Sequence, residues 1–457
     1  MSLSSSPRYR RFSRAGPAPA FVEELPAYTG RRRATLSQPV VRRDPVEHVF
    51  PLEDKGRPWA TLTLRSSAKS AKSIPTFHEK ENINGSFRMM AEKGDSIHSI
   101  TVQVCAGRIS FLLIRVLTRC KITGRVITDS SSAGMSVFLS QSLPLWSKID
   151  SRIAGASSKL LGQCEFPFSI PLSKTVNGDG YDSAFRIPET FLERRTQASI
   201  TYEIAVVVSR GKLRSDSYVK TRFGYIPNLR PDPPSLLRRL AYQENSVLAG
   251  PDVDPEGWSV TGPAVVRGLM FRSHPVAVNC ILALANPMSY TRGTVLPCRL
   301  TVECADAQAL ELLSASNAPV AVLRRIVRFQ SATSKKCVES VEDVSQAVWW
   351  PSPSEADSGL PYSRCLEGEI KLSKNLASSS SIGGRFNVSY TVSLLPFDVI
   401  GFTPSTPGSA LDQPVTIATT YARDSPRPQA YAPPSYDGIT GKEPEVEYTA
   451  KLTRGLR

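Results

Sequence analysis

The sequence predicts an all-β protein made of two tandem antiparallel β-sandwich domains. Along much of the chain, short runs of apolar and polar residues alternate with a period of two, which is the period of a half-buried strand. Clusters of Gly, Pro, Ser and Asn separate these runs, as the frequent turns of an antiparallel sandwich require. No long amphipathic helical pattern interrupts them, which argues against a doubly wound α/β fold.

The first sandwich is predicted over residues 47–227. It follows a disordered basic arm, residues 1–46, which is rich in Ser, Pro and Arg and lacks a sustained hydrophobic period. The clearest strands of this half are rich in β-branched residues, and they span 48–52, 59–64, 99–105 and 200–208.

A Pro-rich connector is predicted over residues 228–259. Ser235 is expected to cap a short helix over 235–243, with Pro234 directly before it. The second sandwich is predicted over residues 260–422. Its expected strands span 320–329, 385–395 and 415–421, and a short helix over 306–313 is expected to cover a sheet edge.

Residues 423–457 are predicted to form a disordered Pro-rich tail, and this tail contains a PPxY motif, Pro433-Pro434-Ser435-Tyr436. Adjacent prolines favour the polyproline II conformation, so docking into the aromatic groove of a WW domain costs little ordering entropy. A chain of this length and composition would contain about 0.09 PPxY motifs by chance. We therefore interpret Pro433, Pro434 and Tyr436 as a WW-domain ligand, and the alternative is a solvated tail that no partner binds.

Positive charge dominates the chain, with a formal net charge of +15, and the first 50 residues carry nine Arg against four Asp and Glu. Acidic lipid headgroups or acidic protein tails are the expected contacts, and nucleic acid is not expected because no nucleic-acid-binding motif accompanies the charge. A solubilising role for the arm, and solvated strand ends for the other clusters, stay open. The residues assigned to this contact are Arg31, Arg32, Arg33, Arg210, Lys212, Arg214, Arg324 and Arg325.

Catalytic and metal-binding patterns are missing from the sequence. The four histidines are unpaired, and the eight cysteines include no CxxC, so no metal, cofactor or enzymatic activity is expected. Cys298 and Cys304 are interpreted as packed core thiols. The N-terminus shows no signal-peptide core, and the longest apolar stretches are about ten residues, so a cytoplasmic protein without a membrane span is expected.

Several local sequences resemble the α-arrestins, the arrestin-related trafficking adaptors, whose layout is two tandem immunoglobulin-like sandwiches with a PPxY tail. In the first half the similar segments are 85–89, 162–168, 185–191 and 200–204, and in the second half they are 268–271, 278–283 and 293–301. The segments 230–235, 240–243, 287–290 and 292–293 look like the arrestin-like proteins of mushroom-forming fungi.

This resemblance implies a non-catalytic adaptor. Its sandwiches would bind a membrane transporter or receptor, and its tail would recruit a HECT-type ubiquitin ligase through WW domains, which promotes ubiquitination, endocytosis and sorting. The expected location is the cytoplasm, with peripheral recruitment to the plasma membrane or endosomes. Leu25-Pro26-Ala27-Tyr28 looks like the variant LPxY form, so Pro26 and Tyr28 are a second WW-binding candidate. The alternative is an arrestin-fold sorting, coat or signalling scaffold, retromer-like or pH-signalling, that needs no WW ligase.

Overall fold

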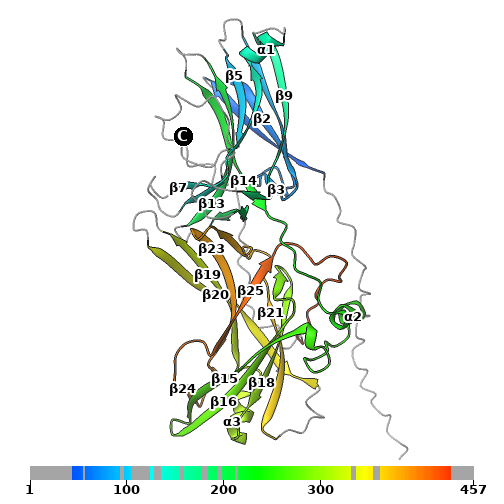
Figure 1. Ribbon diagram of the computed structural model, residues 1–457, viewed down its shortest axis with the longest axis vertical. Coiled ribbons are helices and arrows are strands. Elements are labelled where there is room, and N and C mark those ends of the chain that lie inside the picture. The colour runs from blue at the N-terminus through cyan, green and yellow to red at the C-terminus, as the bar shows by residue number, and fades with distance from the viewer. Residues whose placement is uncertain are drawn as a thin grey trace, which may run out of the picture. The chain divides into compact units, whose positions relative to one another are not determined.

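Two sets of mainly antiparallel sheets account for most of the described chain (Figure 1). The computed structural model describes residues 44–54, 57–92, 97–104, 124–127, 135–154, 159–176, 184–192, 198–210, 215–330, 336–353 and 361–433. The prediction of an all-β fold with two sandwiches is confirmed, because each set stacks the apolar faces of its strands on one another.

The first set has two layers. One layer has the strand order β1-β2-β4-β9, and its strands are β1 (Val46–Asp54), β2 (Arg57–Ser66), β4 (Asn82–Ala91) and β9 (Gly162–Pro171). The other has the order β3-β14-β13-β5-β8, formed by β3 (Thr76–His78), β14 (Ser217–Ile226), β13 (Ser199–Ser209), β5 (Ser99–Val104) and β8 (Gln141–Ser147). Short strands extend this half: β6 (Gly124–Ile127), β7 (Met135–Val137), β12 (Phe191–Leu192), and the separate pair β10 (Thr175–Val176) and β11 (Phe185–Arg186).

Alternating burial explains how these layers stack. Strand β2 buries Leu62 and Leu64, and β13 buries Ile204 and Val206, because every second side chain points into the sandwich. Gly85 of β4 lies where a Cβ would come 2.4 Å from the Thr63 carbonyl oxygen and 2.6 Å from the Phe168 ring. A larger residue there would push β4 away from β2 and β9, its neighbours in the same layer.

The second set is one continuous sheet folded into two layers, with the order β17-β25-β23-β19-β20-β21-β18-β16-β15-β24 and β22 beside β23. Its strands are β15 (Trp258–Met270), β16 (His274–Ala285), β17 (Ser289–Thr291), β18 (Val295–Glu303), β19 (Val320–Gln330), β20 (Cys337–Pro351), β21 (Ser363–Lys371), β22 (Ser380–Ile382), β23 (Phe386–Leu395), β24 (Phe402–Pro404) and β25 (Leu411–Ala418). Strand β20 pairs with β19 up to Gln346 and with β21 from Ala347. It therefore crosses from one layer to the other, as corner strands do.

Short helices lie at the margins of the sheets: α1 (Lys148–Ile153), α2 (Leu236–Glu244), the 3-10 helix Pro255–Gly257 and α3 (Ala307–Leu313). Ser235 caps α2 as predicted, since its side chain accepts a hydrogen bond from the Arg238 N–H. Helix α3 begins after Asp306 and buries Ala309, Leu310 and Leu313 beside β18.

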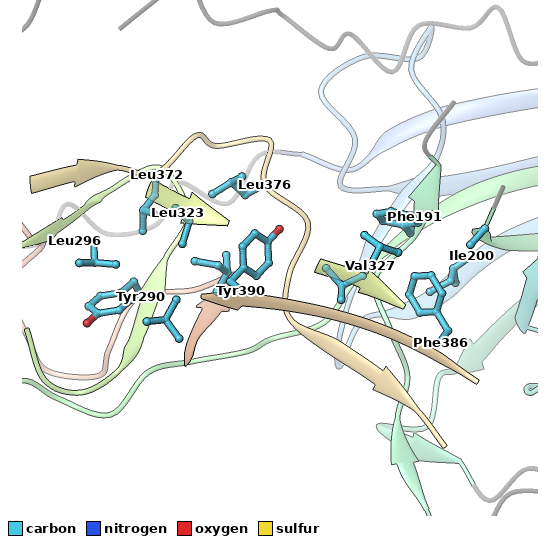
Figure 2. Close-up of a cluster of buried hydrophobic side chains, with 14 of the residues drawn as sticks. Phe191, Ile200, Tyr290, Leu296, Leu323, Val327, Leu372, Leu376, Phe386 and Tyr390 are labelled. Atoms are coloured by element: carbon cyan, nitrogen blue, oxygen red, sulfur yellow. The ribbon is translucent and has the colours of Figure 1, made fainter. Parts of the chain in front are cut away.

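The two sets share a hydrophobic core. Figure 2 shows Phe191 and Ile200 of the first set beside Val327 and Phe386 of the second, and the rings of Phe191 and Phe386 meet edge to face at 5.4 Å. The described residues belong to one compact unit. The division into two domains at residues 227 and 260 stays a prediction.

The predicted strands correspond to β1, β2, β5, β13, β19, β23 and β25, although β25 ends at Ala418, three residues before the predicted end. Cys298 and Cys304 are buried and unpaired, in agreement with packed core thiols. Among the described residues, no helix has both the length and the apolar character that a membrane span requires.

Candidate functional site

The chain after β25 follows the connector, and we call residues 419–431 the docked segment. The Thr419 N–H donates to the Leu229 carbonyl oxygen at 3.0 Å. Further on, Arg230 Nη1 donates to the Tyr421 carbonyl oxygen at 2.9 Å. Backbone groups of the docked segment thus find partners on the connector, which fixes the direction in which the chain leaves the second sandwich.

Helix α2 and strand β21 hold the end of the docked segment. Gln429 Nε2 donates to the Tyr242 carbonyl oxygen at 2.5 Å, and the rings of Tyr242 and Tyr431 stack with centroids 6.4 Å apart. The Tyr431 N–H donates to Glu369 Oε2 at 2.9 Å. Burial raises the pKa of Tyr242 to about 12, because a phenolate is poorly solvated there.

The predicted WW ligand begins two residues after Tyr431. Pro433 is half-buried, whereas Pro434 and Tyr436 lie outside the described residues. The first part of the predicted disordered tail is ordered in the structure. Residues 423–431 pack on the folded body instead of extending from it. The second motif, Pro26 and Tyr28, also lies outside the described residues.

The basic residues of β19 are paired with acids. Arg324, Arg325 and Arg328 stand directly opposite Asp343, Glu342 and Glu339 of β20, with nitrogen to oxygen distances of 2.7, 2.5 and 2.5 Å. Such cross-strand pairs stabilise a hairpin. An acidic lipid at Arg324 or Arg325 would have to compete with these carboxylates.

Of the predicted basic cluster Arg210, Lys212 and Arg214, only Arg210 lies among the described residues. Its guanidinium carbon lies 4.6 Å from the centroid of a Trp59 ring, which is a cation–π distance. Its backbone N–H donates to Asp216 Oδ1 at 3.2 Å. Lys212, Arg214 and the arm residues Arg31, Arg32 and Arg33 lie outside the described residues.

A polar link between the two sandwiches was not predicted from the sequence. Glu189 Oε1 accepts a hydrogen bond from Arg292 Nη1 at 2.8 Å, and Glu189 Oε2 accepts one from the Ser378 N–H at 2.9 Å. The Arg292 and Glu189 side chains are only 16% and 12% exposed. Their separation of 103 residues explains the omission, because no local pattern pairs positions so far apart.

One constellation has the residue types of a hydrolytic triad without its geometry. Ser67 Oγ lies 2.9 Å from His78 Nδ1 and 3.1 Å from Glu81 Oε2, and Glu81 lies 3.5 Å from the same ring nitrogen. A triad needs the serine and the acid on opposite nitrogens of the imidazole, so this exposed cluster cannot activate Ser67. Within the described ranges, no group of three or more His, Cys, Asp or Glu could hold a metal ion.

Comparisons with known proteins give little further information. No protein-family model matches the chain. No curated protein matches it. Among solved structures, the chain matches the sporulation control protein Spo0M from Bacillus subtilis with 11% identity over 63% of this chain and 91% of that one, at a TM-score of 0.21. A similarity this low supports no conclusion about function.

Proposed function

We propose that this chain is a non-catalytic adaptor of the α-arrestin type, which recruits a WW-domain HECT-type ubiquitin ligase to membrane transporters or receptors. Recruitment would promote ubiquitination, endocytosis and sorting of that cargo. The sandwiches offer a rigid surface for cargo, and the motif from Pro433 to Tyr436 offers a polyproline II ligand for the ligase. The resemblance to fungal arrestin-like proteins belongs to the same proposal.

The observation that carries this proposal is the docked segment. The Tyr431 N–H is hydrogen-bonded to Glu369, and the Tyr431 ring stacks on that of Tyr242. The motif starts two residues later. Because the tether between body and motif is this short, a ligase bound to the motif is kept close to the sandwiches. A short tether raises the effective concentration of ligase at the cargo.

The proposed location is the cytoplasmic face of the plasma membrane or of endosomes. Arg31, Arg32 and Arg33 of the arm, together with Arg210, Lys212 and Arg214, would supply attraction to acidic lipids or acidic protein tails, at about 1 kcal/mol for each well-placed cation. No nucleic acid, cofactor or metal enters this proposal.

Proximity labelling in cells tests the proposal. We expect Tyr436→Ala to lose labelling of a WW-domain HECT ligase while cargo labelling persists, and Tyr28→Ala to have a smaller effect. Tyr421→Phe is the matched control, because its ring lies in the docked segment but outside the motif. Unchanged ligase labelling in Tyr436→Ala, with loss in Tyr28→Ala, would show that the LPxY motif is the true ligand.

Loss in neither variant would instead favour a sorting, coat or signalling scaffold that needs no WW ligase. Deleting residues 434–457 separates these outcomes further. The adaptor proposal predicts loss of cargo ubiquitination in this deletion, and the scaffold alternative predicts normal cargo sorting.

A further inference from the structure

Four large apolar side chains are exposed at one end of the first sandwich. Two of them belong to α1, where Ile149 is 70% exposed and Ile153 is 80% exposed. Because they are four positions apart, they lie on the same face of the helix. The other two are Met90, near the end of β4, and Leu161, directly before β9, and both are more than half exposed. Apolar side chains that gather on a surface mark an interaction site.

The pairing of the strands brings these positions to the same end. In one layer, β4 ends where β9 begins, with Ala91 opposite Gly162. In the other layer, Ser99 at the start of β5 is opposite both Ser147 and Ser209. Helix α1 follows Ser147 directly, and Figure 1 shows it at this end of the sandwich. The exposed side chains of α1, of β4 and of the residue before β9 therefore gather there.

Two tryptophans lie at the same end. Trp59 of β2 is next to Ala60, which pairs with Met89, so Trp59 stands beside the end of β4. The Arg210 guanidinium, from the other layer, lies 4.6 Å from the centroid of a Trp59 ring. Trp146 is the last residue but one of β8. Both tryptophans pack on the margin of the core and are partly exposed, as Trp is at a membrane–water boundary.

Charge does not select a partner for this end of the sandwich. Basic and acidic side chains are both present among its described residues: Lys148, Lys159, Arg210, Glu92, Asp150 and Asp216. Apolar burial therefore has to supply most of the binding free energy. A lipid bilayer suits such a surface, because its fluid acyl chains accept protruding apolar side chains without a matching pocket, while Lys and Arg stay at the headgroups.

We propose that this end of the first sandwich inserts Ile149 and Ile153 into the acyl-chain region of a phospholipid bilayer, with Trp59 and Trp146 at the depth of the headgroups. The inference rests on the membrane location proposed above and names the surface that makes the contact. It does not require the WW ligand. Since salt screens exposed charges but not apolar burial, this contact persists at a salt concentration that weakens electrostatic attraction.

Quenching of Trp fluorescence by liposomes with brominated acyl chains tests the insertion. The chain contains five Trp, and three of them, Trp258, Trp349 and Trp350, are at most 9% exposed. Trp59 and Trp146 are therefore the ones that lipid can reach in the folded protein. With liposomes of phosphatidylserine and brominated phosphatidylcholine, we expect quenching of the intact chain at low and at high salt. The same lipids without bromine are the reference.

Replacing the two isoleucines separates insertion from charge. The double variant Ile149→Ser and Ile153→Ser is expected to raise the lipid concentration at half-quenching at least about tenfold, because two apolar side chains no longer leave water. Both positions are exposed, so we expect the variant to fold. The double variant Val247→Ser and Val253→Ser is the matched control, since these connector side chains are 67% and 68% exposed, and its midpoint is expected to stay unchanged.

Two kinds of result would overturn the inference. Sedimentation of the wild type with the liposomes but without quenching, or an equal midpoint in the isoleucine variant, would refute insertion and leave the membrane location intact. The exposed side chains would then be assigned to a protein partner. No sedimentation even at low salt would refute the membrane location together with the insertion. Binding of WW domains is measured apart from both.

Discussion

Individual side chains of the shared core join the two sandwiches. Phe386 is fully buried, and its ring meets that of Phe191 at 5.4 Å. The sequence correctly predicted such local features as the Ser235 cap, because capping depends on residues three positions apart. It could not predict the pair of Phe191 and Phe386, which depends on how two distant strands pack.

Phe386→Ala is expected to lower the free energy of unfolding by about 3 to 5 kcal/mol, because it removes a large buried ring and leaves a cavity. Urea denaturation measures this change. Val49→Ala is the control, since Val49 is 60% exposed and its loss is expected to cost under about 0.5 kcal/mol. A cost below about 1 kcal/mol for Phe386→Ala would contradict the shared core.

At the scale of elements, the strands were predicted well because a period of two is a local property. The 15-residue strand β20 was missed, since it crosses between layers and since Val338, Val341 and Val344 of its first part recur every three residues instead of every two. The docked segment was predicted as disordered tail for a similar reason. Its order depends on Tyr242, which lies 187 residues before Gln429.

Titration of Tyr242 tests whether the docked segment covers α2 as the structure shows. A phenol whose pKa rises from about 10 in the unfolded chain to about 12 in the folded chain stabilises folding fully below pH 10. This stabilisation is lost as the pH rises from 10 through 12. The tyrosinate absorbance of wild type minus Tyr242→Phe should therefore have a midpoint near pH 12. A midpoint near pH 10 would mean that Tyr242 is exposed and the docked segment is released.

At the scale of the whole molecule, Glu189 and Arg292 fix one sandwich to the other. Composition and turn spacing predicted two sandwiches, but a pattern along the chain contains no information about the surface that one sandwich presents to its neighbour. The basic clusters illustrate the same limit. Arg324 and Arg325 read as free positive charge in the sequence, yet β20 places an acid opposite each of them.

A double-mutant cycle on Glu189→Gln and Arg292→Gln is expected to give a coupling energy of about 1 to 3 kcal/mol, because the pair is mostly buried. Urea denaturation of the four proteins measures it. The pair Arg324 and Asp343, which is more exposed, is the comparison and is expected to couple by under about 1 kcal/mol. Equal coupling in the two pairs would contradict the role of Glu189 as a buried link.

We also expect an attraction to anionic membranes, which would be a property of the whole chain. With a net charge of +15, we expect binding to anionic liposomes that weakens as salt rises, because screening shortens the reach of exposed charges. Sedimentation with liposomes at low and high salt measures this, and neutral liposomes are the control. Binding that does not change with salt would argue against an electrostatic surface.

We propose that the chain presents a WW ligand from a folded, non-catalytic body. Fluorescence anisotropy of labelled tandem WW domains from a HECT-type ligase, titrated with the intact chain, tests it most directly. We predict a Kd in the micromolar range, at least about tenfold weaker for Tyr436→Ala and unchanged for Tyr421→Phe. Equal binding by the wild type and Tyr436→Ala would contradict it.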